Sequence, residues 1–408
     1  MFSRRLLLKS SALAMFAEGA APGWLARAAG LSDGQPSRRR KVLVAIFQRG
    51  AVDGLNMVVP YGEADYYALR PGIAIPRPAG DGESAIDLDG FFGLHPSLAP
   101  LKPIFADRRL AIVHAAGSPD PTRSHFDAQD YMESGTPGRK STADGWLNRA
   151  LPDSKASPVQ AVNIGANLAR SLRGPHNAIA MSSLADFQVR DVRSASSFEA
   201  MYGADPLMAA PARETFEALR VIEAVRRSPY APANQAVYPS SRFGQSMEQI
   251  ARLIKADCGL EVAFTELGGW DTHVNEVGAK PSAGQLANLL ADFGQALAAF
   301  HSDMGDRMSD VAVVTMSEFG RTARENGNRG TDHGHGNAMF VMGGQVRGGK
   351  VYGEWPGLTP AKLYEGRDLA VTTDFRDVLG ELTVRHLGAS SPDRVFPDHR
   401  QRFCNLIA

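Results

Sequence analysis

The sequence predicts an α/β fold in which a mostly parallel, doubly wound sheet is flanked by helices. Short, continuous apolar runs such as residues 41–47 and 311–316 are typical of strands that are buried on both faces. They alternate with amphipathic segments of helical length, and this alternation favours parallel strands joined by crossover helices. Polar clusters follow four of the runs. Because the carboxyl ends of parallel strands share one edge of a sheet, we expect these clusters to meet.

The overall composition excludes some classes of function. Lys plus Arg and Asp plus Glu number 44 each among 408 residues, so no basic excess indicates binding to nucleic acid or to an anionic membrane surface. The hydrophobic fraction of 44% and the charged fraction of 22% are those of an ordinary soluble globular protein. Two cysteines, Cys258 and Cys404, are too few for a disulfide framework; they form either one bridge or two core thiols.

The first residues predict export. Arg4 and Arg5 precede a mildly apolar run, and Ala26-Arg27-Ala28 fits a cleavage site, which together resemble a twin-arginine signal. An ordinary secretion signal or a basic tail is the alternative. We expect a signal peptide at residues 1–28, a linker at 29–40 and a single domain at 41–408. The expected location is periplasmic or secreted, with the twin-arginine export machinery as a partner. No other run is long enough to span a membrane once the signal is removed.

Further elements follow in chain order. Strands are expected at residues 109–115 and 259–267, with shorter apolar runs at 159–164 and 178–181. Helices are expected at 96–106, at 124–135 behind a Ser124 cap, and at 212–227, 241–255 and 286–304. A strand-to-helix unit at 369–386 has Thr373 or Asp374 as its cap. Residues 60–93 look like an irregular excursion.

The loops after the first two strands carry the first candidate residues. Asp53 precedes Gly54 after the first strand and is either a metal-binding carboxylate or simple turn chemistry. In the second loop, Thr122 and Ser124 are candidate nucleophiles and Arg123 is a candidate anion clamp, because the positive end of a helix favours an anion. The alternative for Ser124 is a helix cap alone.

Two later loops carry carboxylates and histidines. Asp271 and His273 follow a Gly-Gly turn two residues apart, so in an extended segment both side chains point to one face and converge on one metal. After the strand at 311–316 come Glu318, a candidate ligand or base, and Arg321, a candidate clamp. Next comes a cluster typical of a ligand set or a catalytic group, made of Asp332, His333 and His335.

The segments FQRGAVDGLN, RSHFDAQ, GGWDTH, SEFGRT and GTDHGHG together resemble a bacterial family of unknown function, domain of unknown function fifteen-oh-one. That family is grouped with the alkaline phosphatase and sulfatase superfamily, so the resemblance implies an alkaline-phosphatase-like fold for nearly the whole exported chain. The resemblance places Asp53 at the superfamily's first aspartate and Thr122 or Ser124 in the nucleophile region. It places Asp271 and His273 near the middle Asp/His pair. Glu318 falls where an Asp-His pair usually stands, and His333 or His335 falls at the last histidine.

At two positions the sequence departs from the superfamily pattern, and these departures limit which kind of enzyme the resemblance implies. Phe319 stands where a ligand histidine is expected, and the cysteine of the sulfatase Cys-x-Pro-x-Arg motif is absent. Both departures disfavour a standard sulfatase that uses formylglycine.

The sequence therefore predicts an exported metal-dependent hydrolase that acts on an anionic small-molecule or glycan ester of phosphate or sulfate. The expected cofactor is a divalent metal, with zinc or manganese favoured by the histidines over calcium or magnesium. The seven candidate ligands exceed one tetrahedral site, so either two ions bind or some of these residues only support the ligands. The alternative is a non-catalytic periplasmic binding or assembly protein that retains the fold.

Overall fold

The computed structural model describes residues 39–152, 157–187 and 209–408. The predicted signal peptide and nearly all of the predicted linker lie outside these residues. The main sheet is built from β1 (Val42–Arg49), β5 (Leu110–Gly117), β6 (Ala161–Ile164), β7 (Ile179–Met181), β8 (Val262–Gly268), β9 (Val311–Met316), β10 (Asn337–Gly343), β11 (Lys350–Tyr352) and β12 (Thr373–Asp374). The runs predicted as strands at 41–47, 109–115, 259–267 and 311–316 are thereby confirmed.

The order of strands across the sheet is β11-β5-β10-β9-β1-β8-β6-β7, with β12 also paired to β5. β1 lies at the centre and pairs in parallel with both β8 and β9. β10 is antiparallel to β9 and to β5, whereas the other paired strands are parallel. The predicted mostly parallel sheet is confirmed. Because β10 runs the opposite way, its first residue lies at the edge where the parallel strands end.

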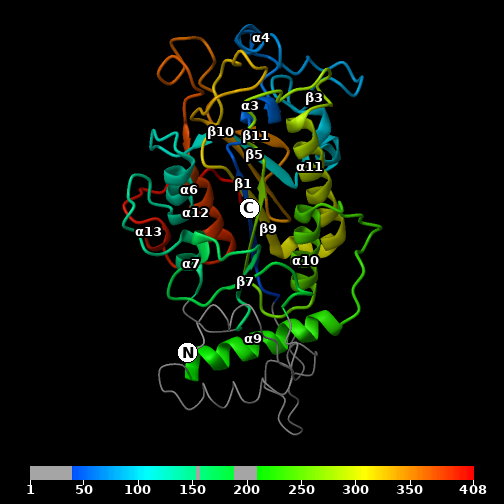
Figure 1. Cartoon of the computed structure of the whole chain (residues 1–408), viewed down its shortest axis with the longest axis vertical. Helices are drawn as coiled ribbons and strands as arrows, with labels where there is room; N and C mark the ends of the chain where they lie inside the picture. The colour runs from blue at the N-terminus through cyan, green and yellow to red at the C-terminus, as the bar shows by residue number, and fades with distance from the viewer. Residues whose placement is uncertain (1–38, 153–156, 188–208) are drawn as a thin grey trace.

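Helices cover both faces of the sheet (Figure 1). On one face lie α10 (Arg242–Lys255) and α11 (Gln285–Met304), and on the other lie α6 (His125–Ser134), α7 (Trp146–Ala150), α12 (Phe375–Glu381) and α13 (Pro392–Val395). Side chains of β1 alternate between the two cores, with Val44 in the first and Phe47 in the second. A strand buried on both faces must be apolar at every position, which is the pattern of β1.

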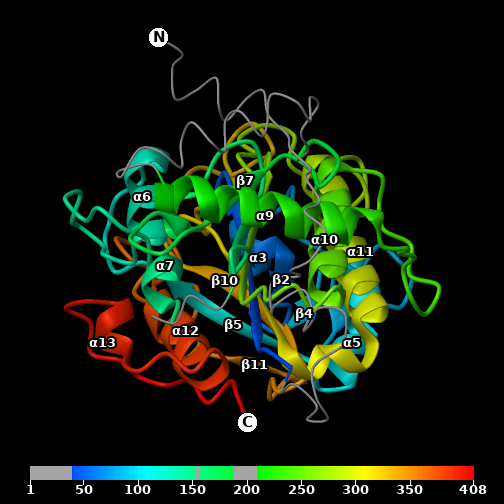
Figure 2. The same cartoon turned by 90° about the horizontal axis from the view of Figure 1, so that it is seen from below.

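The remaining elements are short, apart from α9 (Ala209–Arg227), which crosses the molecule beside β7 (Figures 1 and 2). The short helical elements are α3 (Gly54–Met57), α4 (Ala64–Leu69), η1 (Pro96–Leu101), α5 (Lys102–Ala106), η2 (Arg170–Leu172), η3 (Gly305–Asp310) and the π-helical turn η4 (Leu382–His386). A separate three-stranded sheet, in the order β2-β4-β3, pairs β2 (Val58–Val59), β4 (Gly93–Leu94) and β3 (Ile86–Asp87).

The helix boundaries follow from local chemistry. Ser124 caps α6 by accepting a hydrogen bond from the Asp127 amide, and Gly135 ends it with a φ of 68°. Asp374 caps α12 in the same way. The helix predicted at 96–106 is divided into η1 and α5, because Pro100 lies inside it and lacks a backbone N–H.

Two further features concern export and redox state. Within the described ranges, no helix is both long enough and apolar enough to cross a bilayer. Cys258 and Cys404 are both free thiols, so of the two possibilities that the sequence left open, one bridge or two thiols, the structure has two thiols.

Candidate metal centre

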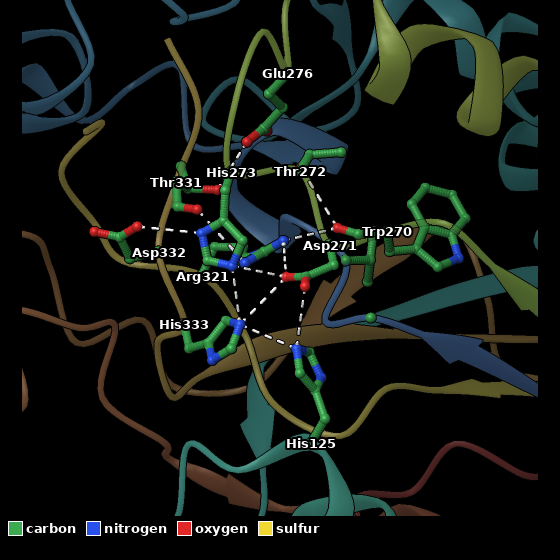
Figure 3. A network of polar contacts seen from close by, with 12 residues as sticks. His125, Trp270, Asp271, Thr272, His273, Glu276, Arg321, Thr331, Asp332 and His333 are labelled. Carbon is green, nitrogen blue, oxygen red and sulfur yellow. Dashed lines mark hydrogen bonds and ion pairs between the residues drawn. The ribbon is translucent and has the colours of Figure 1, made fainter. Parts of the chain in front are cut away.

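Three loops bring polar side chains together at the carboxyl-end edge of the sheet (Figure 3). The loop after β5 leads into α6 and supplies His125, and the loop after β8 supplies Asp271 and His273. The loop after β9 supplies Arg321, and the segment that leads into β10 supplies His333. The clusters after β5, β8 and β9 thus meet at one edge as expected, whereas Asp53 in the loop after β1 is bound to Arg70 and lies outside the group.

The Nε2 atoms of three histidines point toward one another. His333 Nε2 lies 3.0 Å from His125 Nε2 and 3.1 Å from His273 Nε2. The carboxylate of Asp271 closes the group, with Oδ1 at 3.2 Å from His333 Nε2 and at 3.0 Å from His273 Nε2. Its Oδ2 lies 3.5 Å from His125 Nε2. One ligand atom from each of His125, Asp271 and His333 lies within 4.8 Å of the other two.

The opposite nitrogen of each ring is already engaged. His125 Nδ1 lies 2.8 Å from Glu318 Oε1, His273 Nδ1 lies 3.2 Å from Asp332 Oδ1, and His333 Nδ1 lies 3.0 Å from the Arg123 carbonyl oxygen. These acceptors fix the proton of each neutral ring on Nδ1. The lone pair of each Nε2 is therefore directed into the centre, which is the arrangement of histidines that ligate metals in proteins.

The donor set fits a divalent ion. Two Nε2 lone pairs at 3.0 Å repel each other unless a positive charge lies between them. In a tetrahedral site with metal–nitrogen bonds of about 2.0–2.1 Å, ligand atoms are about 3.3–3.4 Å apart. Among His125, Asp271 and His333, the separations of 3.0–3.5 Å match that spacing to within a few tenths of an ångström. His273 lies beside this group, with its Nε2 at 3.1 Å from His333 Nε2, but is not one of the three residues whose ligand atoms are all within 4.8 Å of one another. Imidazole with one carboxylate suits zinc or manganese better than calcium or magnesium.

The neighbours also set the protonation of the group. The hydrogen bond to Glu318 raises the pKa of His125, whereas burial lowers the pKa of His333. Burial alone would raise the pKa of Asp271, but the charges of Arg321 and the histidines outweigh burial, so the pKa is lowered overall. Asp271 is therefore an anion at neutral pH, and His333 gives up its proton more readily than His125 does.

Glu318 supports the centre instead of pointing its oxygens into the group. It is 1% exposed, and its Oε1 accepts hydrogen bonds from the Gly50 amide, from Gln129 Nε2 and from His125 Nδ1. Asp332 has the same relation to His273 and also accepts from Asn326 Nδ2. Both predicted ligands thus orient a histidine through its far nitrogen, in keeping with the alternative that some candidates only support the ligands.

Arg321 is turned inward to Asp271. Its Nη2 donates to Asp271 Oδ1 at 2.9 Å and to the Trp270 carbonyl oxygen at 3.0 Å, and its side chain is fully buried. A guanidinium in this position fixes the carboxylate and balances its charge. The sequence suggested Arg321 as an anion clamp, whereas its guanidinium is here bound to Asp271.

Close packing of the loops depends on glycine. A Cβ on Gly50, which has a φ of +113°, would lie 2.7 Å from the Asp271 amide nitrogen, and a Cβ on Gly330 would lie 2.4 Å from the His273 carbonyl oxygen. No other residue allows backbones to approach so closely. Gly50 and Gly330 therefore allow the loops that carry the candidate ligands to pack closely together.

Phe319 forms an apolar wall of the centre. Its ring centroid lies 5.0 Å from that of His125 and 5.0 Å from that of His333, and the residue is 3% exposed. The side chain at the position where the superfamily resemblance placed a ligand histidine thus packs against two of the histidines.

Asp53 lies outside the group of ligand atoms. Both of its oxygens are bound by Arg70, with Nη2 donating to Oδ1 at 3.0 Å and Nη1 donating to Oδ2, and both side chains are fully buried. Asp53 also caps α3 by accepting from the Leu55 amide. Of the two roles considered for Asp53, a turn residue and a metal ligand, the first fits better, because both carboxylate oxygens are already bound by Arg70.

The predicted nucleophile loop is placed beside the centre through His125. Ser124 Oγ accepts from the Asp127 amide at 3.5 Å, and Thr122 Oγ1 accepts from the Ser124 amide at 3.2 Å. The guanidinium of Arg123 turns to Asp368, donating to Oδ2 from Nη2 at 2.6 Å, and to Glu365. Arg123 thus contributes its carbonyl oxygen to the centre and its charge to a neighbouring ion pair.

His335 is separated from His333 by Gly334 and does not join the cluster. Its ring stacks on Tyr364 with centroids 4.4 Å apart, and it is 7% exposed. Gly334 packs against the Arg321 backbone, and the rings on its two sides have different partners, Tyr364 for His335 and His125 for His333.

His125 is the ligand candidate that sequence reasoning missed. A single histidine inside a helical segment has no spacing partner to mark it. The available signal was its position directly after the Ser124 cap, because a side chain in the first turn of a helix points back toward the helix start and so toward the strand edge.

Comparisons with known proteins complete the description. Residues 111–398 match a family model described as protein of unknown function (DUF1501). No curated protein matches the chain. Among solved structures, the chain is similar to a sulfatase from Pseudoalteromonas sp., PsFucS1, with 12% identity and a TM-score of 0.43, covering 91% of this chain and 72% of that one. It is also similar to the C-terminal periplasmic domain of EcEptC from Escherichia coli in complex with Zn, with 10% identity and a TM-score of 0.36, covering 75% and 73%.

Proposed function

We propose, from the premise that the chain belongs to the DUF1501 family of proteins of unknown function, that it is a metal-dependent hydrolase of phosphate or sulfate esters. The observation that carries the proposal is that His125, Asp271 and His333 each offer a ligand atom within 4.8 Å of the other two, with His273 beside them and the Nδ1 of each histidine held by an acceptor. Such a constellation at the carboxyl ends of parallel strands is where α/β enzymes place their reacting groups.

His125, His273, His333 and Asp271 would hold the ion, zinc or manganese by the donor set. When bound, the ion would lower the pKa of an attacking hydroxyl or water and offset negative charge on the ester oxygens. Glu318 and Asp332 accept from the Nδ1 atoms of two imidazoles and so orient their Nε2 atoms toward the centre, and Arg321 keeps Asp271 oriented.

Ser124 is the stronger of the two nucleophile candidates. It adjoins His125 in the chain, and its hydroxyl stands at the positive end of α6. Thr122 Oγ1 accepts from the Ser124 amide, which ties it to the backbone of the same loop. In a covalent mechanism, the Ser124 oxygen would attack the phosphorus or sulfur atom, and the alcohol would leave with the Ser124 proton. Water would then hydrolyse the Ser124 ester, releasing phosphate or sulfate and restoring the hydroxyl. In a direct mechanism, water would take the place of Ser124 as the nucleophile.

The ion pairs of the arginines favour a second candidate function. Arg123 is bound to Asp368 and Glu365, and Arg321 is bound to Asp271, so neither guanidinium is free to clamp an ester oxygen bidentately. A non-catalytic periplasmic binding or assembly protein would need no such clamp. In either case we propose that the chain is exported by a twin-arginine signal to the periplasm or beyond.

The test is metal analysis and turnover of the protein purified from the periplasm without refolding. We expect about one zinc or manganese ion per chain, and metal-dependent hydrolysis of at least one member of a panel of phosphate and sulfate esters. Ser124→Ala should remove turnover while the metal stays bound. If the protein contains no bound metal and shows no metal-dependent turnover, the hydrolase proposal is refuted. Ligand binding without turnover, unchanged by Ser124→Ala and Thr122→Ala, would support the binding protein.

A further inference from the structure

A stripe of polar side chains runs along α6 from the centre toward the end of β1. His125, Gln129 and Glu133 follow one another at intervals of four residues, so they lie on one face of the helix. The first two bind Glu318, which follows β9, and the last two bind Arg49, the final residue of β1. This face of α6 is thus hydrogen-bonded to the sheet along its whole length.

Gln129 lies in the middle of the stripe and contacts both partners. Its Nε2 donates to Glu318 Oε1 at 2.9 Å, and its Oε1 accepts from Arg49 Nη1 at 3.1 Å. A carboxylate can only accept hydrogen bonds, and a guanidinium can only donate them. The two partners therefore fix which end of the Gln129 amide faces Glu318, because a turned amide would bring oxygen against oxygen.

Arg49, which fixes the amide, is itself held by the sheet and the helix. Its Nη2 lies 2.9 Å from Glu133 Oε1, and its Nε donates to Glu266 of β8. Its guanidinium carbon lies 4.3 Å from the centroid of the Phe47 ring in β1. Glu133 is 4% exposed. The orientation of Gln129 is therefore set by groups that are anchored in regular structure.

The contact between Gln129 and Glu318 acts on His125. Glu318 Oε1 also accepts from His125 Nδ1 and from the Gly50 amide, both at 2.8 Å, so three donors surround this one oxygen. Without the donor from Gln129, the oxygen would be free to move toward the space that the amide leaves. The ring of His125 would follow it, and the opposite nitrogen, Nε2, is the atom that lies 3.0 Å from His333 Nε2.

The same arrangement occurs a second time at the centre. Asn326 Nδ2 donates to Asp332 Oδ1 at 3.2 Å, and this oxygen lies 3.2 Å from His273 Nδ1. The Oδ1 atom of Asn326 accepts from the amides of Asn328 and Gly330, which fixes the direction of its side-chain amide. A carboxamide of fixed orientation thus stands behind both carboxylates that orient a histidine.

We propose that Gln129 is a positioning residue of the metal centre. It holds Glu318 Oε1 against His125 Nδ1, Arg49 fixes the end of the amide that does so, and the direction of His125 Nε2 follows from both. This inference rests on the proposed function for the ion, and it adds a residue that touches neither the ion nor a substrate. Gln129 acts on the centre through Glu318.

The experiment is a double-mutant cycle of Gln129→Met and Glu318→Met, in which affinity for zinc and for manganese is measured by competition with a chromogenic chelator. Methionine keeps the unbranched shape of both side chains and has no N–H to donate. Loss of a carboxylate that orients a ligand histidine weakens metal binding about 10–100-fold, and we expect a smaller loss of about 3–10-fold in Gln129→Met. In the Glu318→Met background, Gln129→Met should change the affinity by less than about twofold.

A second substitution, Gln129→Glu, separates the hydrogen bond from packing. Glutamate keeps the size of the side chain and the contact with Arg49, but it sets a carboxylate against Glu318 in place of the N–H donor. It should lose at least as much metal affinity as Gln129→Met. Thermal unfolding of the metal-free variants measures their stability separately. A residue that only packs would lower stability without a loss of affinity that depends on Glu318.

Gln249→Met is the matched control. Gln249 is also a half-buried glutamine on a helix with both ends of its amide bonded, since its Nε2 donates to the Gln245 carbonyl oxygen and its Oε1 accepts from the Leu184 amide. It belongs to α10, on the other face of the sheet from α6 (Figure 1). This variant should keep the metal affinity of the unsubstituted protein.

The outcomes separate this inference from the proposed function. Unchanged affinity in Gln129→Met or Gln129→Glu, or an equal loss with and without Glu318, would overturn the positioning role and leave the metal centre in place. If the unsubstituted protein binds neither metal, the proposed function fails, and the proton NMR signal of the His125 Nδ1–H group in the metal-free protein decides. Loss of that signal in Gln129→Met would support the positioning role, and an unchanged signal would overturn it.

Discussion

His125 Nε2 and His333 Nε2 lie 3.0 Å apart, although the two residues are 208 positions apart in the chain. Each ring uses its Nδ1 to donate to an oxygen, so both Nε2 atoms present a lone pair to the other. Such a contact is stable with either a metal ion or a shared proton between the two nitrogens. This one distance is the reason for assigning a metal centre, and the first prediction tests it directly.

Removing a ligand histidine should remove the metal. In His125→Ala and in His333→Ala, one of the converging Nε2 atoms is lost, and we expect the stoichiometric zinc or manganese to fall to background after dialysis against a competing chelator. His301→Ala is the control, since His301 belongs to the last turn of α11 and not to the centre. Metal content is measured by elemental analysis. Full occupancy in either ligand variant would show that the ion binds elsewhere.

Glu318→Gln distinguishes a supporting residue from a ligand. The amide oxygen of glutamine can still accept from the Gly50 amide, but the charge that holds the His125 Nδ1 proton is gone. Loss of such a supporting carboxylate typically weakens metal binding about 10–100-fold, and we expect a decrease in that range, measured by competition with a chromogenic chelator. Complete loss of the metal would show that Glu318 ligates it. An unchanged affinity would show that Glu318 does not orient His125.

Gly50→Ala should damage both stability and metal binding. The alanine Cβ would lie 2.7 Å from the Asp271 amide nitrogen, at a φ of +113°. Strain at such a backbone position costs about 1–3 kcal/mol, and relief of the clash would move Asp271. Gly80→Ala is the matched control, because Gly80 also has a positive φ, +72°, but faces open space. Thermal unfolding and metal titration of both variants should show the larger loss, and a lowered metal affinity, for Gly50→Ala alone.

Glu276→Gln should flatten the pH dependence of stability above pH 5. Burial raises the pKa of Glu276 well above its usual value of 4.5, and the charge of Asp53 adds to the rise. A carboxyl whose pKa is raised by folding stabilises the fold below its unfolded pKa, and this contribution is lost as the pH rises toward the folded pKa. The loss amounts to at most about 1.4 kcal/mol per pH unit.

Glutamine keeps the polar contact that a protonated Glu276 makes and has no proton to lose. Glu276 Oε2 accepts from Thr331 Oγ1 at 2.7 Å, and a glutamine amide oxygen can accept the same bond. Thermal unfolding of both proteins between pH 5 and pH 9 should show the unsubstituted chain losing stability relative to Glu276→Gln. Parallel curves would mean that Glu276 has the same pKa in the folded and unfolded chains.

The fold was accessible from sequence because its signals are local. β1, β5 and β9 are continuous apolar runs, and α6 carries both its Ser124 cap and its Gly135 end in the sequence. The reversed direction of β10 was not accessible. Its residues read as one more apolar run, and only the path of the loop at 317–336 decides which way the strand enters the sheet.

The candidate site was accessible in part, for a physical reason. Asp271 and His273 could be paired from sequence because they are two residues apart in an extended segment, and their side chains do converge. The role of Asp53 depends on Arg70, and that of Glu318 depends on His125. Those partners are fixed by tertiary contacts between segments that no spacing rule connects. A carboxylate after a strand reads the same whether it binds a metal, an arginine or a histidine.

The wide separation of the centre's residues along the chain has a consequence for metal loading. Residues 125, 271, 273 and 333 meet only when β5, β8 and β10 are all in the sheet, so an unfolded chain offers no preformed binding site. An ion held by these residues would bind the folded chain, and its binding would then add to stability by mass action. A chain that crosses a membrane already folded would therefore carry the metal of the compartment in which it folded, and a chain that crosses unfolded would select from the metals outside.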